Sequence, residues 1–229
     1  YIPNTITCLN LFSGCLGIVY AFQGELKYAS IAILVAAIFD FFDGMVARVL
    51  QVYSDIGKEL DSLADMVSFG LLPAVIVYQL FLKVPQVPCL GSYFGFSAFL
   101  IAIFSALRLA KFNVDTRQSE NFIGLPTPAN ALLVASLPMI IAEGSVCLSS
   151  FILNPFFLFA FSLVMSILLV IELPLLSLKF KNLNIANNLL RYILIFSALI
   201  LLLIFRFAAV PMILLTYILL SIIQFRIIK

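Results

Sequence analysis

The sequence predicts an all-α integral membrane protein. Hydrophobic residues occupy 64% of the 229 positions and charged residues only 10%, a balance that soluble globular domains do not show. Apolar stretches of about 20 residues, enough to cross the hydrocarbon core of a bilayer as helices, follow one another along most of the chain. Because these stretches leave no room for a separate soluble domain, we expect a single membrane domain over residues 1–229.

Short polar or proline-containing breaks separate eight expected spans. Gly24 and Glu25 end the first span, Pro85 ends the third, and only Arg206 and Pro211 separate the last two. The length rule for membrane helices then places the spans at residues 5–22, 29–50, 57–82, 96–112, 129–146, 151–173, 189–205 and 208–225.

The basic residues predict the orientation. If the loops after spans two, four and six and the C-terminus share one side, every Lys and Arg except Lys27, Lys83 and Arg206 lies there, so this side is expected to be cytoplasmic. We therefore expect a protein of the cell (inner) membrane. A signal peptide is not expected, because Asn4 and Asn10 interrupt the first apolar stretch. The net charge of +2 is too small to favour a nucleic-acid partner.

The four cysteines have no metal-ligand spacing. We expect Cys8 and Cys15 to be buried packing residues, and Cys89 and Cys147 to lie in loops on one side without forming a disulfide.

Two pairs of aspartates stand out against this apolar background. Asp40 and Asp43 are three residues apart and Asp61 and Asp65 are four apart, so each pair lies on one face if both segments are helical. Carboxylates beside hydrocarbon are costly and mark a functional site. The motif lies at the expected cytoplasmic ends of spans two and three.

Four neighbouring carboxylates would repel one another unless cations neutralise them. Only Arg48 and Lys58 lie nearby in the sequence, too few for four acidic groups. Oxygen-only ligation suits Mg²⁺ or Mn²⁺, and the chain contains no histidine. The sequence therefore predicts a divalent-metal site.

Three further residues of the motif favour a phosphate ligand. Gly44 and Ala47 remove side-chain bulk from one helix face, and Arg48 offers a guanidinium fork that suits a diphosphate. Metal ions between the aspartates could bridge the same phosphates, and a carboxylate could accept a proton from an attacking hydroxyl. This combination indicates phosphoryl-type transfer from a diphosphate donor.

The pattern Asp40-x2-Asp43-Gly44-x2-Ala47-Arg48-x8-Gly57-x3-Asp61-x3-Asp65 resembles the signature of the CDP-alcohol phosphatidyltransferases, homodimeric membrane enzymes with a six-helix core. The resemblance implies that residues 1–175 form this core and that two additional transmembrane helices occupy 176–229. It also implies that Asp40, Asp43 and Asp61 bind two Mg²⁺ or Mn²⁺ ions, and that Asp65 contacts the second ion and acts as general base. The residues implied to bind CDP-diacylglycerol are Asn4, Thr7, Gly44, Ala47, Arg48 and Ser54.

Three further stretches narrow the resemblance to the phosphatidylserine synthase branch, which implies L-serine as the acceptor. They are Ser68-Phe69-Gly70-x2-Pro73, the stretch from Arg108 to Asn113, and the stretch from Gly124 to Ala129. Arg108, Lys111 and Asn113 are the candidate acceptor-binding residues.

Other interpretations stay open at this point. The basic residues Arg108 and Lys111 could equally bind the phosphate of glycerol 3-phosphate or of inositol phosphate, or form an ordinary cytoplasmic flank. The aspartates could form a charge-paired cluster without chemistry, or serve a cation-coupled transporter. The chain lacks the paired, Gly/Pro-broken helices typical of such transporters.

Overall fold

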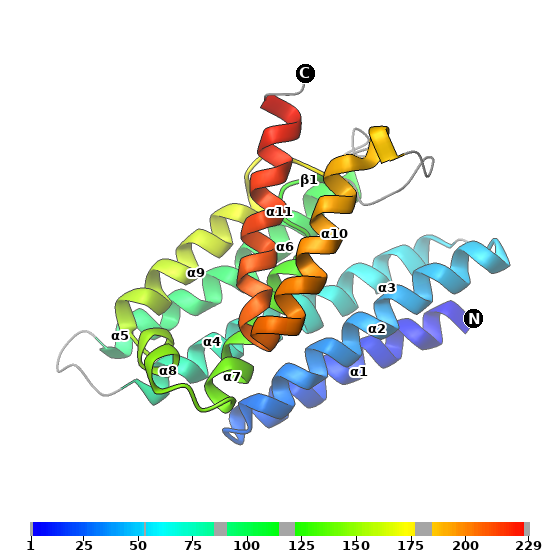
Figure 1. The fold of residues 1–229 in the computed structure, drawn as a ribbon. Helices are drawn as coiled ribbons and strands as arrows, with labels where there is room; N and C mark the ends of the chain where they lie inside the picture. The colour runs from blue at the N-terminus through cyan, green and yellow to red at the C-terminus, as the bar shows by residue number, and fades with distance from the viewer. Residues whose placement is uncertain (1, 53, 85–90, 115–121, 177–184, 227–229) are drawn as a thin grey trace.

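The computed structural model describes residues 2–52, 54–84, 91–114, 122–176 and 185–226. Nearly all of them are helical (Figure 1). The elements are α1 (Ile2–Phe22), α2 (Leu26–Leu50), α3 (Asp55–Asp65), the π-helix η1 (Met66–Leu71), α4 (Leu72–Lys83), α5 (Gly91–Gly95), η2 (Phe96–Ala98), α6 (Phe99–Val114), β1 (Phe122–Ile123), α7 (Thr127–Ala142), α8 (Val146–Ile152), α9 (Pro155–Val170), β2 (Pro174–Leu175), α10 (Ile185–Phe205), η3 (Arg206–Ala208) and α11 (Ala209–Arg226).

The lengths and composition of these helices confirm an all-α integral membrane protein. Five helical stretches among the described residues are long and apolar enough to cross a membrane: Ile2–Phe22, Leu26–Leu50, Asp55–Lys83, Tyr93–Val114 and Asn188–Gln224. The last stretch is a hairpin, because the chain reverses at Arg206, whose φ is 49°, and α10 and α11 then lie side by side (Figure 1). The two strands form only a two-residue antiparallel pair.

One expected span differs from the structure. Residues 151–173 were predicted to form one continuous helix, but α8 and α9 meet at a 64° bend. The bend follows from the residues at the break. Asn154 accepts hydrogen bonds from the backbone N–H groups of Phe156 and Phe157, and Pro155 occupies the first turn of α9, so a new helix begins here.

The helix that bears the second aspartate pair runs without a loop through α3, η1 and α4. Its middle section, η1, begins directly after Asp65, and single π-helical turns inside α-helices occur frequently at functional sites. On this continuous helix, Phe69, Leu72 and Ile76 are fully buried and belong to the main hydrophobic core.

Helix α1 supports both aspartate-bearing helices, since it packs against α2 and against α3, η1 and α4. Its glycines permit this close approach: a Cβ atom at Gly14 would lie 2.4 Å from Ser68 Oγ, and one at Gly17 would lie 2.4 Å from Leu72 Cδ2. Small residues serve the same purpose at other helix contacts in membranes.

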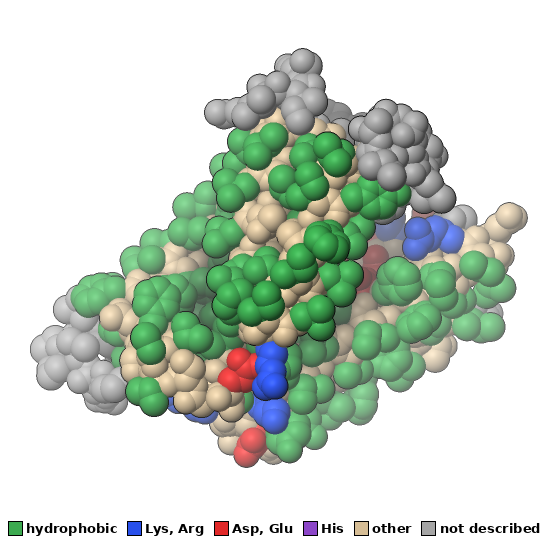
Figure 2. Space-filling view, viewed as in Figure 1, with side chains coloured by type: hydrophobic (Ala, Val, Ile, Leu, Met, Phe, Trp, Pro, Cys, Tyr) green, Lys and Arg blue, Asp and Glu red, His purple; other side chains and the backbone are tan. Residues whose placement is uncertain are grey.

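The outer surface is suited to lipid. In Figure 2, hydrophobic side chains cover most of the visible face, and charged side chains are visible at its lower edge and on its right.

The expectation that Cys8 and Cys15 are buried is wrong, because both are exposed on α1. This helix turns its polar and small residues inward and its bulky apolar residues outward. Cys147 is also exposed, and Cys89 lies outside the described residues.

Candidate active site

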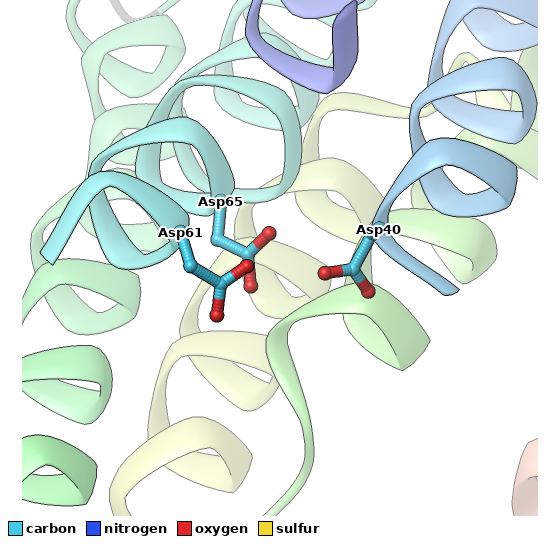
Figure 3. A group of neighbouring side chains, drawn as sticks. All are labelled: Asp40, Asp61 and Asp65. Carbon is cyan, nitrogen blue, oxygen red and sulfur yellow. The ribbon is translucent and has the colours of Figure 1, made fainter. Parts of the chain in front are cut away.

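Three of the four predicted aspartates converge between α2 and α3. Asp61 and Asp65 are one turn apart on α3 and point toward Asp40 on α2 (Figure 3). One carboxylate oxygen from each residue lies within 4.8 Å of the other two. Asp65 is the most enclosed of the three, with 8% of its surface exposed. The spacing in the sequence therefore produces a compact acidic cluster.

The fourth aspartate, Asp43, is buried beside α1 and lies outside this group of three. Its Oδ2 accepts a hydrogen bond of 2.7 Å from the hydroxyl of Thr7. Thr7, which the family resemblance implies as a residue that binds the lipid donor, thus contacts the aspartate one turn from Asp40 on α2.

The three clustered carboxylates fit a divalent cation. Oδ1 of Asp61 is buried and has no hydrogen-bond partner among the described residues. In the described part of the chain, the one salt bridge joins Lys111 to Glu172, so no basic side chain neutralises the cluster. A buried, unpartnered acceptor is costly, and three hard oxygen donors suit Mg²⁺ or Mn²⁺.

Next to the cluster, Gly44 leaves an open helix face. A Cβ atom added at Gly44 would meet only Arg48 Nη2, at 3.9 Å. Arg48 is exposed, and its Nε donates a hydrogen bond of 2.8 Å to the carbonyl oxygen of Gly44. The rest of the guanidinium group is therefore available to a ligand over Gly44 and Ala47.

The N-terminal ends of α1 and α3 meet nearby. Ser54 caps α3, because its Oγ accepts a hydrogen bond of 3.0 Å from the N–H of Gly57. A Cβ atom at Gly57 would lie 2.9 Å from Ser54 Oγ and 3.1 Å from Asn4 Oδ1. Two of the residues expected to bind the donor, Asn4 and Ser54, are thus brought together around a glycine.

The three candidate acceptor residues do not form one group. Arg108 is 6% exposed, and its Nε donates a hydrogen bond of 2.6 Å to the carbonyl oxygen of Leu125. Lys111 instead faces outward and pairs with Glu172 at 3.5 Å, a contact between exposed side chains that contributes little to stability. Asn113 Nδ2 donates to Ser62 Oγ at 2.9 Å and so connects α6 to α3. Of the three, only Arg108 is a buried cation.

Asn10 also belongs to the site, although it is not among the residues predicted from the sequence. This residue is fully buried, and its Nδ2 donates a hydrogen bond of 3.2 Å to Oδ1 of Asp65. Ser68, directly after the aspartate motif, donates to the backbone oxygen of Asn10 at 3.0 Å. Asn10 follows Thr7 by about one helical turn within an apolar stretch, so the two polar side chains lie on the same helix face. This pattern could have indicated from the sequence that Asn10 faces the site.

The fold and this site together define a membrane protein with an acidic cluster between two of its transmembrane helices, and this cluster could hold a metal ion. A family model described as CDP-alcohol phosphatidyltransferase matches residues 1–178. The chain belongs to this family of membrane phosphotransferases, which as a family generally depend on divalent metal ions.

Individual relatives agree with the family match. The chain is 36% identical over 154 residues to CDP-diacylglycerol–serine O-phosphatidyltransferase of Bacillus subtilis, covering 65% of this chain and 84% of that protein. It is 36% identical to archaetidylserine synthase of Methanothermobacter thermautotrophicus and 40% identical to the Helicobacter pylori CDP-diacylglycerol–serine O-phosphatidyltransferase. These two matches cover 59% and 58% of this chain, but only 56% and 54% of the relatives.

Proposed function

We propose that this protein transfers the phosphatidyl group of CDP-diacylglycerol to the hydroxyl of L-serine, producing phosphatidylserine and CMP. The observation that carries the proposal is the convergence of Asp40, Asp61 and Asp65 within 4.8 Å, with no basic side chain pairing them in the described part of the chain. The family supports the reaction type, and the names of the relatives support serine as the acceptor.

In this proposal the residues around Gly44 bind the donor. Its acyl chains remain in the lipid, while its diphosphate lies over the open face of Gly44 and Ala47, within reach of the Arg48 guanidinium. Asn4 and Ser54, which meet at Gly57, contact the cytidine end of the donor, and Thr7 assists by holding Asp43 in place.

Asp65 acts as the general base. Asn10 donates to one of its oxygens, Oδ1, and in this proposal the other oxygen accepts the proton of the serine hydroxyl. The serine oxygen then forms a bond to the phosphorus that bears the diacylglycerol. The bond from this phosphorus to the bridging oxygen breaks, and CMP leaves with the electron pair of that bond.

Asp40, Asp43, Asp61 and Asp65 would hold two Mg²⁺ or Mn²⁺ ions. When bound, such ions polarise phosphate oxygens and neutralise the negative charge that develops on them. Arg108, a buried cation without a carboxylate partner among the described residues, is the best candidate for binding the carboxylate of the amino-acid acceptor. Lys111 and Asn113 would act at most from the edge of the site.

The site would face the cytoplasm from the inner membrane. Arg48, Lys58 and Lys111 belong to the same end of the helices as the aspartates, and excess positive charge is typical of the cytoplasmic side. Water-soluble serine and metal ions are available there. We also propose a homodimer, on the family resemblance alone.

A direct acceptor comparison tests this function. The purified protein in detergent–CDP-diacylglycerol mixed micelles is supplied with Mn²⁺ and with L-serine, glycerol 3-phosphate or inositol, and CMP release is measured. We expect release with serine only, and none in the presence of a chelator. Release with another acceptor would reassign the substrate, and no release with any of the three acceptors would refute the proposed reaction.

A further inference from the structure

The side-chain amide of Asn10 has an oxygen atom, Oδ1, that the proposed mechanism does not use. Its Nδ2 faces Asp65, but its Oδ1 is buried and has no hydrogen-bond partner among the described residues. The orientation of the amide follows from the role of its neighbour: as a general base Asp65 must be ionised, an ionised carboxylate only accepts hydrogen bonds, and it therefore requires the NH₂ group. Asn10 thus presents an unused acceptor oxygen one hydrogen bond away from Asp65.

An unpaired buried carbonyl oxygen is costly, and native proteins rarely retain one without a reason. The backbone around Asn10 is also held firmly. Ser68 donates to the Asn10 backbone oxygen, and Gly14, one turn further along, allows α1 to approach Ser68 closely. The amide is therefore positioned before any ligand arrives, which favours binding because little side-chain freedom remains to be lost.

We propose that Oδ1 of Asn10 accepts a hydrogen bond from the α-ammonium group of the amino-acid acceptor, and so determines the choice of an amino alcohol. This inference rests on the proposed function. In serine only Cβ and Cα separate the hydroxyl oxygen from the ammonium nitrogen. A residue that receives the ammonium must therefore lie beside the base that receives the hydroxyl proton, as Asn10 does.

Charge supports the same assignment. Oδ1 of Asn10 only accepts hydrogen bonds and therefore suits the ammonium group of an amino acid, whereas glycerol 3-phosphate brings only negative charge. Arg108 is available for the carboxylate end of the amino acid. Asn10 is then a specificity-determining residue, distinct from the base and from the metal ligands.

The test compares two small molecules that differ only in the amino group. L-serine is used as the substrate, and 3-hydroxypropionate, which lacks the amino group, is used as an inhibitor competing with serine. CMP release gives the KM for serine and the inhibition constant of 3-hydroxypropionate for the native protein, Asn10→Ala and Asn10→Leu. Ser30→Ala is the matched control, because Ser30 is also fully buried with an unpartnered Oγ but lies about 15 Å along α2 from Asp40.

We expect the Asn10 variants to raise the KM for serine by about 10-fold or more, the typical effect of losing a hydrogen bond to a charged group. The inhibition constant of 3-hydroxypropionate and the KM for CDP-diacylglycerol should stay within about twofold of the native values, which also shows that the variants are folded. Ser30→Ala should change neither constant. The Asn10 variants also lose the hydrogen bond to Asp65, which lowers kcat. The comparison therefore uses only the KM for serine and the inhibition constant of 3-hydroxypropionate.

Equal changes in both affinities, or no change in either, would overturn the role of Asn10 while leaving the proposed function intact. If the native protein releases no CMP with serine but does so with glycerol 3-phosphate, the proposed function fails, and the inference fails with it.

Discussion

Thr7 of α1 donates a 2.7 Å hydrogen bond to Asp43 of α2, across 36 positions of sequence. Both side chains are buried, with 4% and 6% of their surfaces exposed. This contact connects α1 to the first aspartate pair. One turn further along α1, the contact between Asn10 and Asp65 connects α1 to the second pair. Helix α1 is therefore part of the site and not only a membrane anchor.

Replacing Thr7 with Val should weaken this connection. Val has nearly the same shape but no hydroxyl, so a buried carboxylate oxygen loses its donor, and we expect a loss of about 1–3 kcal/mol in the free energy of unfolding. Thermal unfolding in detergent measures the effect. Thr216→Val is the control, because the hydroxyl of Thr216 makes an exposed hydrogen bond to its own helix backbone at Met212. Equal unfolding temperatures for the two variants would show that the contact contributes nothing.

Asp65→Asn should remove turnover. The amide cannot accept the serine proton, and loss of a general base lowers the rate by about 10²–10⁴-fold. We expect binding of CDP-diacylglycerol to change much less, because Arg48 and the face of Gly44 remain. CMP release and donor binding are measured separately. Asp55→Asn, an exposed substitution in the first turn of α3, is the control and should retain native activity. Native turnover in Asp65→Asn would contradict the assignment of the base.

Divalent cations should stabilise the protein. An ion that binds only the folded state at about 100 times its Kd adds roughly 2.7 kcal/mol of stability. We therefore expect Mg²⁺ or Mn²⁺ to raise the unfolding temperature of the native protein, and a chelator to reverse the effect. Asp40→Asn should reduce the shift, since it removes one of the three clustered carboxylates. A shift of native size in Asp40→Asn would place the binding site elsewhere.

Gly14→Ala should disturb the support of Asp65. The added Cβ would lie 2.4 Å from Ser68 Oγ and 3.0 Å from Ser68 Cα, so α1 and η1 must move apart. Overpacking of this kind costs about 1–3 kcal/mol, and we expect lower turnover together with a lower unfolding temperature. Gly95→Ala is the matched control, because its Cβ would make an ordinary contact of 3.5 Å with Tyr78. If both variants behave alike, close packing of α1 on η1 is not required.

The acidic cluster shows which features local sequence could predict. Asp61 and Asp65 share a helix face because they are four residues apart, and Asp40 stands out because its neighbours are apolar. Both facts depend only on residues close in the chain, so the sequence alone predicted the helices, their membrane setting and the acidic motif. The direction of α1 could not be predicted in this way. Lipid and protein core are both apolar, so hydrophobicity does not tell the inner face of a membrane helix from its outer face, and Cys8 and Cys15 were assigned to the wrong one.

The sequence by itself determined the class of protein, the family signature and the acidic residues that form the candidate site. Only the tertiary structure decided that Asp43 lies beside Thr7, that Arg108 is buried while Lys111 faces outward, and that Asn10 reaches Asp65. The reason is physical. The contact between Asn10 and Asp65 spans 55 positions, and it forms only because glycines on α1 let three helices pack closely enough for short polar side chains to meet.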